Sequence, residues 1–160
     1  MDRSPDEMAE EYFREAYNLQ VSGKLDEAIE LYRKSISVHP TAEAHTFLGW
    51  TYSFKGEYQD AIDECKRAIE IDPDFGNPYN DIGAYLIRLG RFREAIPWLQ
   101  QACAAKRYDA RHYPFYNLGR VYERLGEVRM AIVEYQNAAD YDPEYTAALH
   151  AVERLRAWMN

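Results

Sequence analysis

The chain has 160 residues, of which 47% are hydrophobic, 29% charged and 14% aromatic, a composition typical of one folded, soluble domain. Its net charge of −8 argues against nucleic-acid binding, which needs a basic face. Two cysteines cannot form a disulfide framework, and no segment contains the roughly 18 apolar residues of a membrane span. The first residues do not resemble a signal peptide, so we expect a cytoplasmic protein.

Glycine and proline mark the ends of the expected helices. Ser4, Pro5, Asp6 and Glu7 form the pattern of a capping box, so the first helix should begin near residue 5. Four glycines then follow at intervals of 33, 34 and 36 residues, each at a point where one helix ends and the chain reverses. A period of this length indicates stacked helix pairs. The four glycines are Gly23, Gly56, Gly90 and Gly126.

This period divides the chain into units at about 9–41, 42–75, 76–111 and 112–145, with a capping helix at about 144–159. Pro40, Pro73 and Pro143 close units, whereas Pro97 is expected in the first turn of a helix. The third unit has two extra residues within 106–111. They predict a longer second helix or turn, or else a wider groove beside the fourth unit. The capping helix should bury Tyr145, Leu149, Val152 and Leu155.

Each unit also repeats a series of residue types at fixed offsets. In the fourth unit they are Phe115, Leu118-Gly119, Tyr122, Gly126, Ala131, Tyr135, Ala138 and Pro143. The series resembles the tetratricopeptide repeat over essentially the whole chain. The resemblance implies an all-α fold: a right-handed α-solenoid of antiparallel helix pairs, with about four repeats and a C-terminal capping helix, in a single domain over residues 1–160. The first unit departs from the pattern, with Glu15-Ala16 in place of Leu-Gly.

Neither metal binding nor catalysis is predicted. No two of the four histidines are four residues apart, the spacing that would place them on one helix face for zinc. Cys65 and Cys103 fall where the repeat buries its side chains, so we expect them to act as small hydrophobic residues. The chain has no glycine-rich phosphate-binding loop. We expect no enzyme activity, no catalytic residue, no metal and no cofactor.

The resemblance implies that one face of each first helix lines a concave groove. Aromatic residues that the repeat does not require occupy this face, and such a strip is typical of an interaction site. Arginines gather toward the C-terminal end, where their guanidinium groups suit carboxylates. Packing between neighbouring helices is the alternative for the aromatics, and simple solvation is the alternative for the arginines. The candidate groove residues are Phe13, Tyr17, Trp50, Phe54, Asn77, Asn80, Arg88, Tyr113, Tyr116, Arg120, Arg124 and Arg154.

These features predict an adaptor or scaffold that binds a peptide or protein. A partner segment would place apolar side chains on the aromatic half of the groove and acidic side chains at the arginine end. A secretion-type chaperone that holds a hydrophobic client is one alternative, and self-association through Trp158 and Met159 is another. Some tetratricopeptide proteins grip a C-terminal carboxylate with Lys and Asn, but this chain has Phe13 and Tyr17 at the first two of those positions. That activity is therefore not expected.

Overall fold

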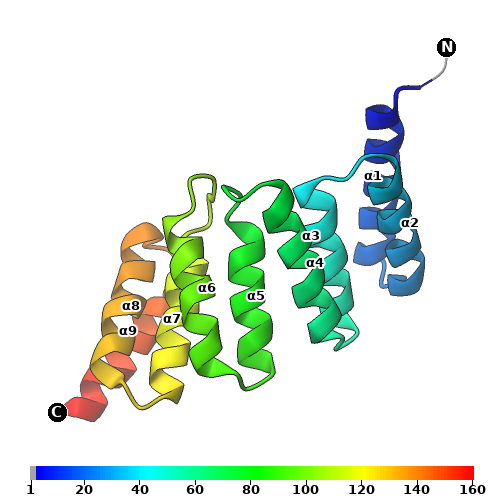
Figure 1. The fold of residues 1–160 in the computed structure, drawn as a ribbon. Coiled ribbons are helices and arrows are strands. Elements are labelled where there is room, and N and C mark those ends of the chain that lie inside the picture. The colour runs from blue at the N-terminus through cyan, green and yellow to red at the C-terminus, as the bar shows by residue number, and fades with distance from the viewer. Residues whose placement is uncertain (1–2) are drawn as a thin grey trace.

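The computed structural model describes residues 3–160, and within them the chain forms nine α-helices joined by short connections (Figure 1). Consecutive helices pack as pairs, the pairs stack in a row, and the two ends of the chain lie at opposite ends of that row. The predicted all-α arrangement of stacked helix pairs is confirmed. The helices are α1 (Pro5–Val21), α2 (Leu25–Val38), α3 (Ala42–Phe54), α4 (Tyr58–Ile71), α5 (Asn77–Arg88), α6 (Phe92–Ala104), α7 (His112–Arg124), α8 (Val128–Tyr141) and α9 (Thr146–Met159).

The helix ends follow the local signals of the sequence. The Ser4 hydroxyl accepts a hydrogen bond from the Glu7 amide (3.2 Å), and the Glu7 carboxylate accepts one from the Ser4 amide (3.0 Å), so the capping box is present. The four turn glycines all have φ between 74° and 80°, a left-handed conformation that other residues adopt only with strain. Each turn can therefore reverse the chain within a few residues and bring the second helix back along the first.

One expectation about helix starts and one about the buried face of the last helix are wrong. Pro97 lies inside α6, which begins at Phe92, so this proline does not mark the first turn. The last helix, expected at about 144–159, spans Thr146–Met159 and buries Ala148 and Ala151 together with two of the predicted residues. Leu149, predicted to be buried, is exposed. The buried face of α9 is therefore formed by Ala148, Ala151, Val152 and Leu155, and Leu149 lies outside it.

The two helices of a pair approach most closely at the small residue in the first helix. A Cβ atom added at Gly83 would lie 2.3 Å from Cδ2 of Leu99, and one added at Gly119 would lie 2.5 Å from the ring of Tyr135. Leu99 is fully buried between α5 and α6. The absence of a side chain at these positions therefore sets how closely the paired helices pack.

The row of helix pairs is curved, as the contacts between neighbouring pairs show. The first helices touch one another directly: α1 touches α3, α3 touches α5, and α5 touches α7. Between residues 3 and 160 no comparable contact joins α2 to α4 or α4 to α6. Because the first helices are closer together than the second helices, α1, α3, α5 and α7 line the inner, concave face.

The extra residues of the third unit form a loop and do not extend α6, which ends at Ala104. The loop pairs with the turn between α4 and α5, since the Gly76 amide donates to the Arg107 carbonyl and the Arg107 amide donates to the Asp74 carbonyl, both at 3.0 Å. The Arg107 guanidinium forms an ion pair with Asp72 and lies over the ring of Phe75. The loop therefore joins the third unit to the preceding connection.

Gly83→Ala should lower the free energy of unfolding by about 1–3 kcal/mol, because the new methyl group would overlap Leu99 in a filled core. A Gly83→Ala/Leu99→Ala double variant should be less destabilised than the sum of the two single variants, because the methyl group would partly fill the space left by leucine. Urea unfolding followed by circular dichroism measures all three. Strictly additive effects would show that the Gly83–Leu99 contact does not set the helix spacing.

Candidate binding groove

The accessible residues of the inner helices form stripes along the concave face. On α5 the stripe is Asn77, Asp81, Ala84 and Arg88, whereas most other residues of this helix are buried. Their spacing of four, three and four residues places them on one side of a helix. The equivalent stripe on α3 is Glu43, Phe47, Trp50 and Phe54.

The N-terminal half of the concave face carries an aromatic cluster, made of Phe13 and Tyr17 from α1 and Phe47, Trp50 and Phe54 from α3. The ring of Phe47 lies 5.2 Å from that of Phe13 and 5.9 Å from that of Tyr17, between ring centroids. Trp50 lies 5.8 Å from Phe47 and 5.1 Å from Phe54. Tyr17, Trp50 and Phe54 remain 42%, 40% and 56% exposed, so the cluster presents an apolar surface to solvent.

Phe47 was missed by the sequence analysis and lies at the centre of this cluster. It touches aromatic rings from three helices, because Tyr32 of α2 lies behind it at 6.3 Å. Phe13, predicted to be a free groove residue, is partly buried between Tyr32 and Phe47. Phe13 and Phe47 therefore support the rings that remain exposed.

The two predicted aromatics of α7 form a second group. Tyr113 is 46% exposed and packs on His112 and Tyr145. Tyr116 is partly buried, with its ring 5.2 Å from those of both Tyr135 and Tyr145. No aromatic residue occupies the α5 stripe between the two groups. The expectation of one continuous aromatic strip is therefore wrong: the six predicted aromatics form two groups separated by a polar helix.

Asn77 is exposed at the start of α5, but Asn80, the other predicted asparagine, does not face the groove. It is buried, and its side-chain oxygen accepts a hydrogen bond from Nδ2 of Asn117 at 3.0 Å. Oδ1 of Asn117 in turn accepts from the Arg120 guanidinium at 3.2 Å. Asn80 thus helps to position Arg120 through Asn117, and the groove residue of this turn is its neighbour Asp81.

The side chains of all four predicted arginines line one cavity, which we call the arginine pocket. Its volume is about 540 Å³, within the usual range for ligand-binding clefts. Residues from α4 to α9 contribute to it, although the first and the last of them are nearly one hundred positions apart in the chain. The lining residues are Tyr58, Ile87, Arg88, Phe92, Tyr116, Arg120, Glu123, Arg124, Tyr135 and Arg154.

Neutral groups hold three of these arginines, and a carboxylate holds the fourth. Besides the bond between Arg120 and Asn117, Nε of Arg88 donates to the Tyr58 hydroxyl at 3.0 Å. The guanidinium of Arg124 lies 5.0 Å from the centre of the Phe92 ring. Arg154 alone among the four forms an ion pair with a carboxylate of residues 3–160: its two terminal nitrogens donate to the two oxygens of Glu123, at 2.7 and 3.0 Å.

Among residues 3–160, Glu123 is the only acidic residue that lines the pocket. Its carboxylate also accepts a hydrogen bond from the Tyr135 hydroxyl at 2.9 Å. The hydrogen bonds from Arg154 and Tyr135 lower the pKa of Glu123, so it is ionised at neutral pH. The pocket therefore contains four positive charges and one negative charge.

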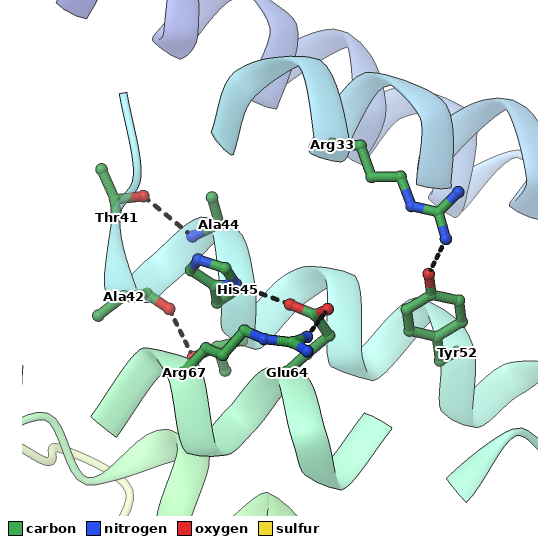
Figure 2. A network of polar contacts seen from close by, with 9 residues as sticks. Arg33, Thr41, Ala42, Ala44, His45, Tyr52, Glu64 and Arg67 are labelled. Atoms are coloured by element: carbon green, nitrogen blue, oxygen red, sulfur yellow. Dashed lines mark hydrogen bonds and ion pairs between the residues drawn. The ribbon is translucent and has the colours of Figure 1, made fainter. Parts of the chain in front are cut away.

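A polar network behind the aromatic cluster belongs to the scaffold. Figure 2 shows His45 of α3 pointing toward Glu64 of α4, with Nδ1 2.7 Å from the carboxylate, while Arg67 pairs with the same carboxylate. The same view shows Arg33 of α2 donating to the Tyr52 hydroxyl at 2.5 Å. The contact of His45 with Glu64 joins the two helices of one pair, and that of Arg33 with Tyr52 joins α3 to the preceding pair, so these groups hold α3 between α2 and α4.

The two cysteine thiols are held in their protonated form by burial. Burial raises the pKa of the Cys103 thiol to about 12 and that of Cys65 well above its usual value, so neither is a ready nucleophile. Across residues 3–160 no three His, Cys, Asp or Glu side chains are grouped as metal ligands. In the same range no helix combines the length and the apolar character needed to cross a membrane.

Asp81 lies in the α5 stripe between the two aromatic groups. It is partly buried and forms no hydrogen bond or ion pair with the side chains of residues 3–160. Burial raises the pKa of its carboxyl from 3.8 to about 7. Near neutral pH the centre of the groove can therefore present either a neutral carboxyl or a carboxylate without a counterion.

The sequence pattern of the tetratricopeptide repeat matches three stretches of the chain, residues 42–75, 79–107 and 113–145. The chain is 36% identical over 75 residues to the small glutamine-rich tetratricopeptide repeat-containing protein 2 of Mycosarcoma maydis. The aligned segment covers 46% of this chain and 21% of that protein. It is 26% identical over 141 residues to the type IV pilus assembly protein PilF of Pseudomonas aeruginosa, covering 88% of this chain and 53% of PilF.

Solved structures share the fold. The crystal structure of MamA aligns with a TM-score of 0.78 and 26% identity, over 90% of this chain and 84% of that one. The PilF structure of Pseudomonas aeruginosa aligns with a TM-score of 0.87 and 22% identity, over 94% of this chain and 68% of that one. The chain thus spans about a fifth and about half of the lengths of the two curated relatives compared above.

Asp81→Asn should stabilise the protein at pH 8 and have little effect at pH 4. A carboxyl whose pKa rises on folding stabilises the fold below its unfolded pKa, near 4, and this contribution is lost as the pH rises toward 7. Asparagine removes the penalty of ionisation, by on the order of 1–4 kcal/mol at pH 8. Thermal unfolding at the two pH values measures the difference. Asp109→Asn, at an exposed loop position, should change stability little at either pH, and an equal gain for Asp81→Asn at both would contradict the assignment.

Proposed function

Because the chain belongs to the tetratricopeptide repeat family, whose members generally mediate protein–protein interactions, we propose that it is a non-enzymatic adaptor that binds a segment of another protein along its concave face. The segment places apolar side chains on the aromatic cluster and acidic side chains at the arginine pocket. The exposed aromatic cluster is the observation that carries this proposal.

Exposed aromatic residues in contact with one another favour binding for a physical reason. Tyr17, Trp50 and Phe54 have rigid rings that lose little conformational freedom on binding, and Phe13 and Phe47 already hold them in place. Covering such a surface removes apolar area from water, and buried aromatic anchors commonly dominate the energy of an interface. The scaffold has no structural need for these rings to be accessible.

The distribution of charge gives the bound segment a direction. Residues 1–75 have a net charge of −9 and residues 76–160 a net charge of +1, and the arginine pocket lies in the second half. An acidic end of the partner is repelled by the N-terminal half and attracted by the pocket. A chaperone for a hydrophobic client would need only the aromatic cluster, so a contribution from both regions favours the adaptor.

Replacing both Trp50 and Phe54 by alanine should weaken binding of the partner by about 2 kcal/mol or more, which is roughly 30-fold in affinity. The partner is first captured by the wild-type protein, its binding segment is mapped with overlapping peptides, and that peptide is titrated by calorimetry. The helix content of the variant should be unchanged, because both side chains are on the surface.

Trp158→Ala is the matched control, since Trp158 is 74% exposed but lies outside the cluster at the end of α9. It should leave the affinity for the peptide unchanged. The same variant tests self-association: a dimer by light scattering that is lost with Trp158→Ala would favour assembly through α9. Equal affinity of the wild type and the Trp50/Phe54 variant would rule out the aromatic cluster as the binding surface.

A further inference from the structure

The arginine pocket has more positive charge than the protein itself balances. Of its four arginines only Arg154 is paired with a carboxylate, that of Glu123, in residues 3–160. Three guanidinium groups, those of Arg88, Arg120 and Arg124, therefore face one cavity without an acidic partner. Like charges that line one cavity repel one another, and the repulsion is relieved by an anion of matching charge.

The three unpaired arginines are held in position by neutral groups. The Tyr58 hydroxyl binds Arg88 and the Asn117 side chain binds Arg120, while Arg124 stacks on an aromatic ring. Each contact uses at most part of the guanidinium, which has five N–H donors. The remaining donors are available to a ligand, and an incoming anion would need to order little of the pocket.

Glu123 shows how this pocket binds an anionic group. Its carboxylate receives two parallel hydrogen bonds from Arg154 and a third from the Tyr135 hydroxyl. A two-pronged guanidinium contact supported by a hydroxyl group is the geometry with which proteins recognise carboxylates and phosphates. Glu123 therefore occupies part of the anion-binding capacity of the pocket and reduces its net charge by one.

We propose that the arginine pocket binds a phosphorylated side chain of the partner segment, with Glu123 as an internal competitor for Arg154. A phosphomonoester has a charge of about −2 near neutral pH and three acceptor oxygens, which matches three free guanidinium groups better than one carboxylate does. The inference refines the acidic end of the proposed partner, and it makes binding at this end dependent on phosphorylation.

The test uses the full chain and three short blocked peptides, Gly-Xaa-Gly, in which Xaa is phosphoserine, glutamate or serine. Binding is followed by NMR of the arginine side-chain Nε–H groups. The phosphoserine peptide should shift the signals of Arg88, Arg120 and Arg124 and bind at least about tenfold more tightly than the glutamate peptide. Its affinity should rise with pH around pH 6, where the phosphate loses its second proton.

Variants separate the roles of the pocket residues. Arg120→Ala and Arg124→Gln should each weaken binding of the phosphoserine peptide by about tenfold, whereas Glu123→Gln should strengthen it severalfold because Arg154 is released. Arg129→Ala is the matched control, since Arg129 is exposed on α8 and does not line the pocket. Circular dichroism confirms that each variant is folded, and Glu123→Gln preserves the size and polarity of the side chain.

Three results would overturn the proposal. They are equal binding of the glutamate and phosphoserine peptides, binding of inorganic phosphate as tight as that of the phosphopeptide, and weaker binding by Glu123→Gln in a folded protein. The Trp50/Phe54 variant should bind the phosphoserine peptide like the wild type. A failure of the aromatic cluster in partner binding is therefore distinguishable from a failure of the pocket.

Discussion

The close approach of the two helices in each pair is the constraint on which the rest of this molecule depends. At Gly83 there is no room for even one additional carbon atom beside Leu99. Besides this pairing, α1 touches α3, α3 touches α5 and α5 touches α7, whereas no comparable contact joins α2 to α4 or α4 to α6 within residues 3–160. The curvature of the array, and with it the existence of a concave face, follows from this difference in spacing.

The same contact between neighbouring inner helices is used with different chemistry along the groove. Between α1 and α3 it is the ring contact of Phe13 with Phe47, and between α5 and α7 it is the hydrogen bond of Asn80 with Asn117. The residue of α5 in the equivalent position toward α3 is Asp81, which forms no hydrogen bond or ion pair with the side chains of residues 3–160. The same contact position in the repeat thus carries aromatic side chains at one end of the groove, amide side chains at the other end, and a carboxyl between them. The repeat determines where the contact occurs, and the residue type determines what that part of the groove can bind.

Much of this arrangement follows from the sequence because helix ends are determined locally. Turn glycines and the capping box depend on neighbouring backbone groups, so they can be identified from a single chain. That Asp81 faces the groove in place of Asn80 could not be predicted in the same way. The two residues differ by only 100° around the helix, and which of them faces the groove depends on how α7 stacks against α5. Phe47 was missed for the same reason, because its place in the groove depends on how the inner helices stack. Pro97 was assigned to a first turn from its local preference alone, whereas α6 begins at Phe92 and contains it.

The arginine pocket illustrates how a repeat array builds a site that no single repeat contains. Arg88, Arg120 and Arg124 come from two inner helices, while α9 supplies Arg154 and α8 supplies Tyr135. The last helix therefore packs against α8 and also completes the pocket. Four arginines around one cavity repel one another, and Glu123 reduces that repulsion through its ion pair with Arg154. The residue that stabilises the free protein is thus the one that opposes an anionic ligand, so stability without a ligand and affinity for it are linked through a single carboxylate.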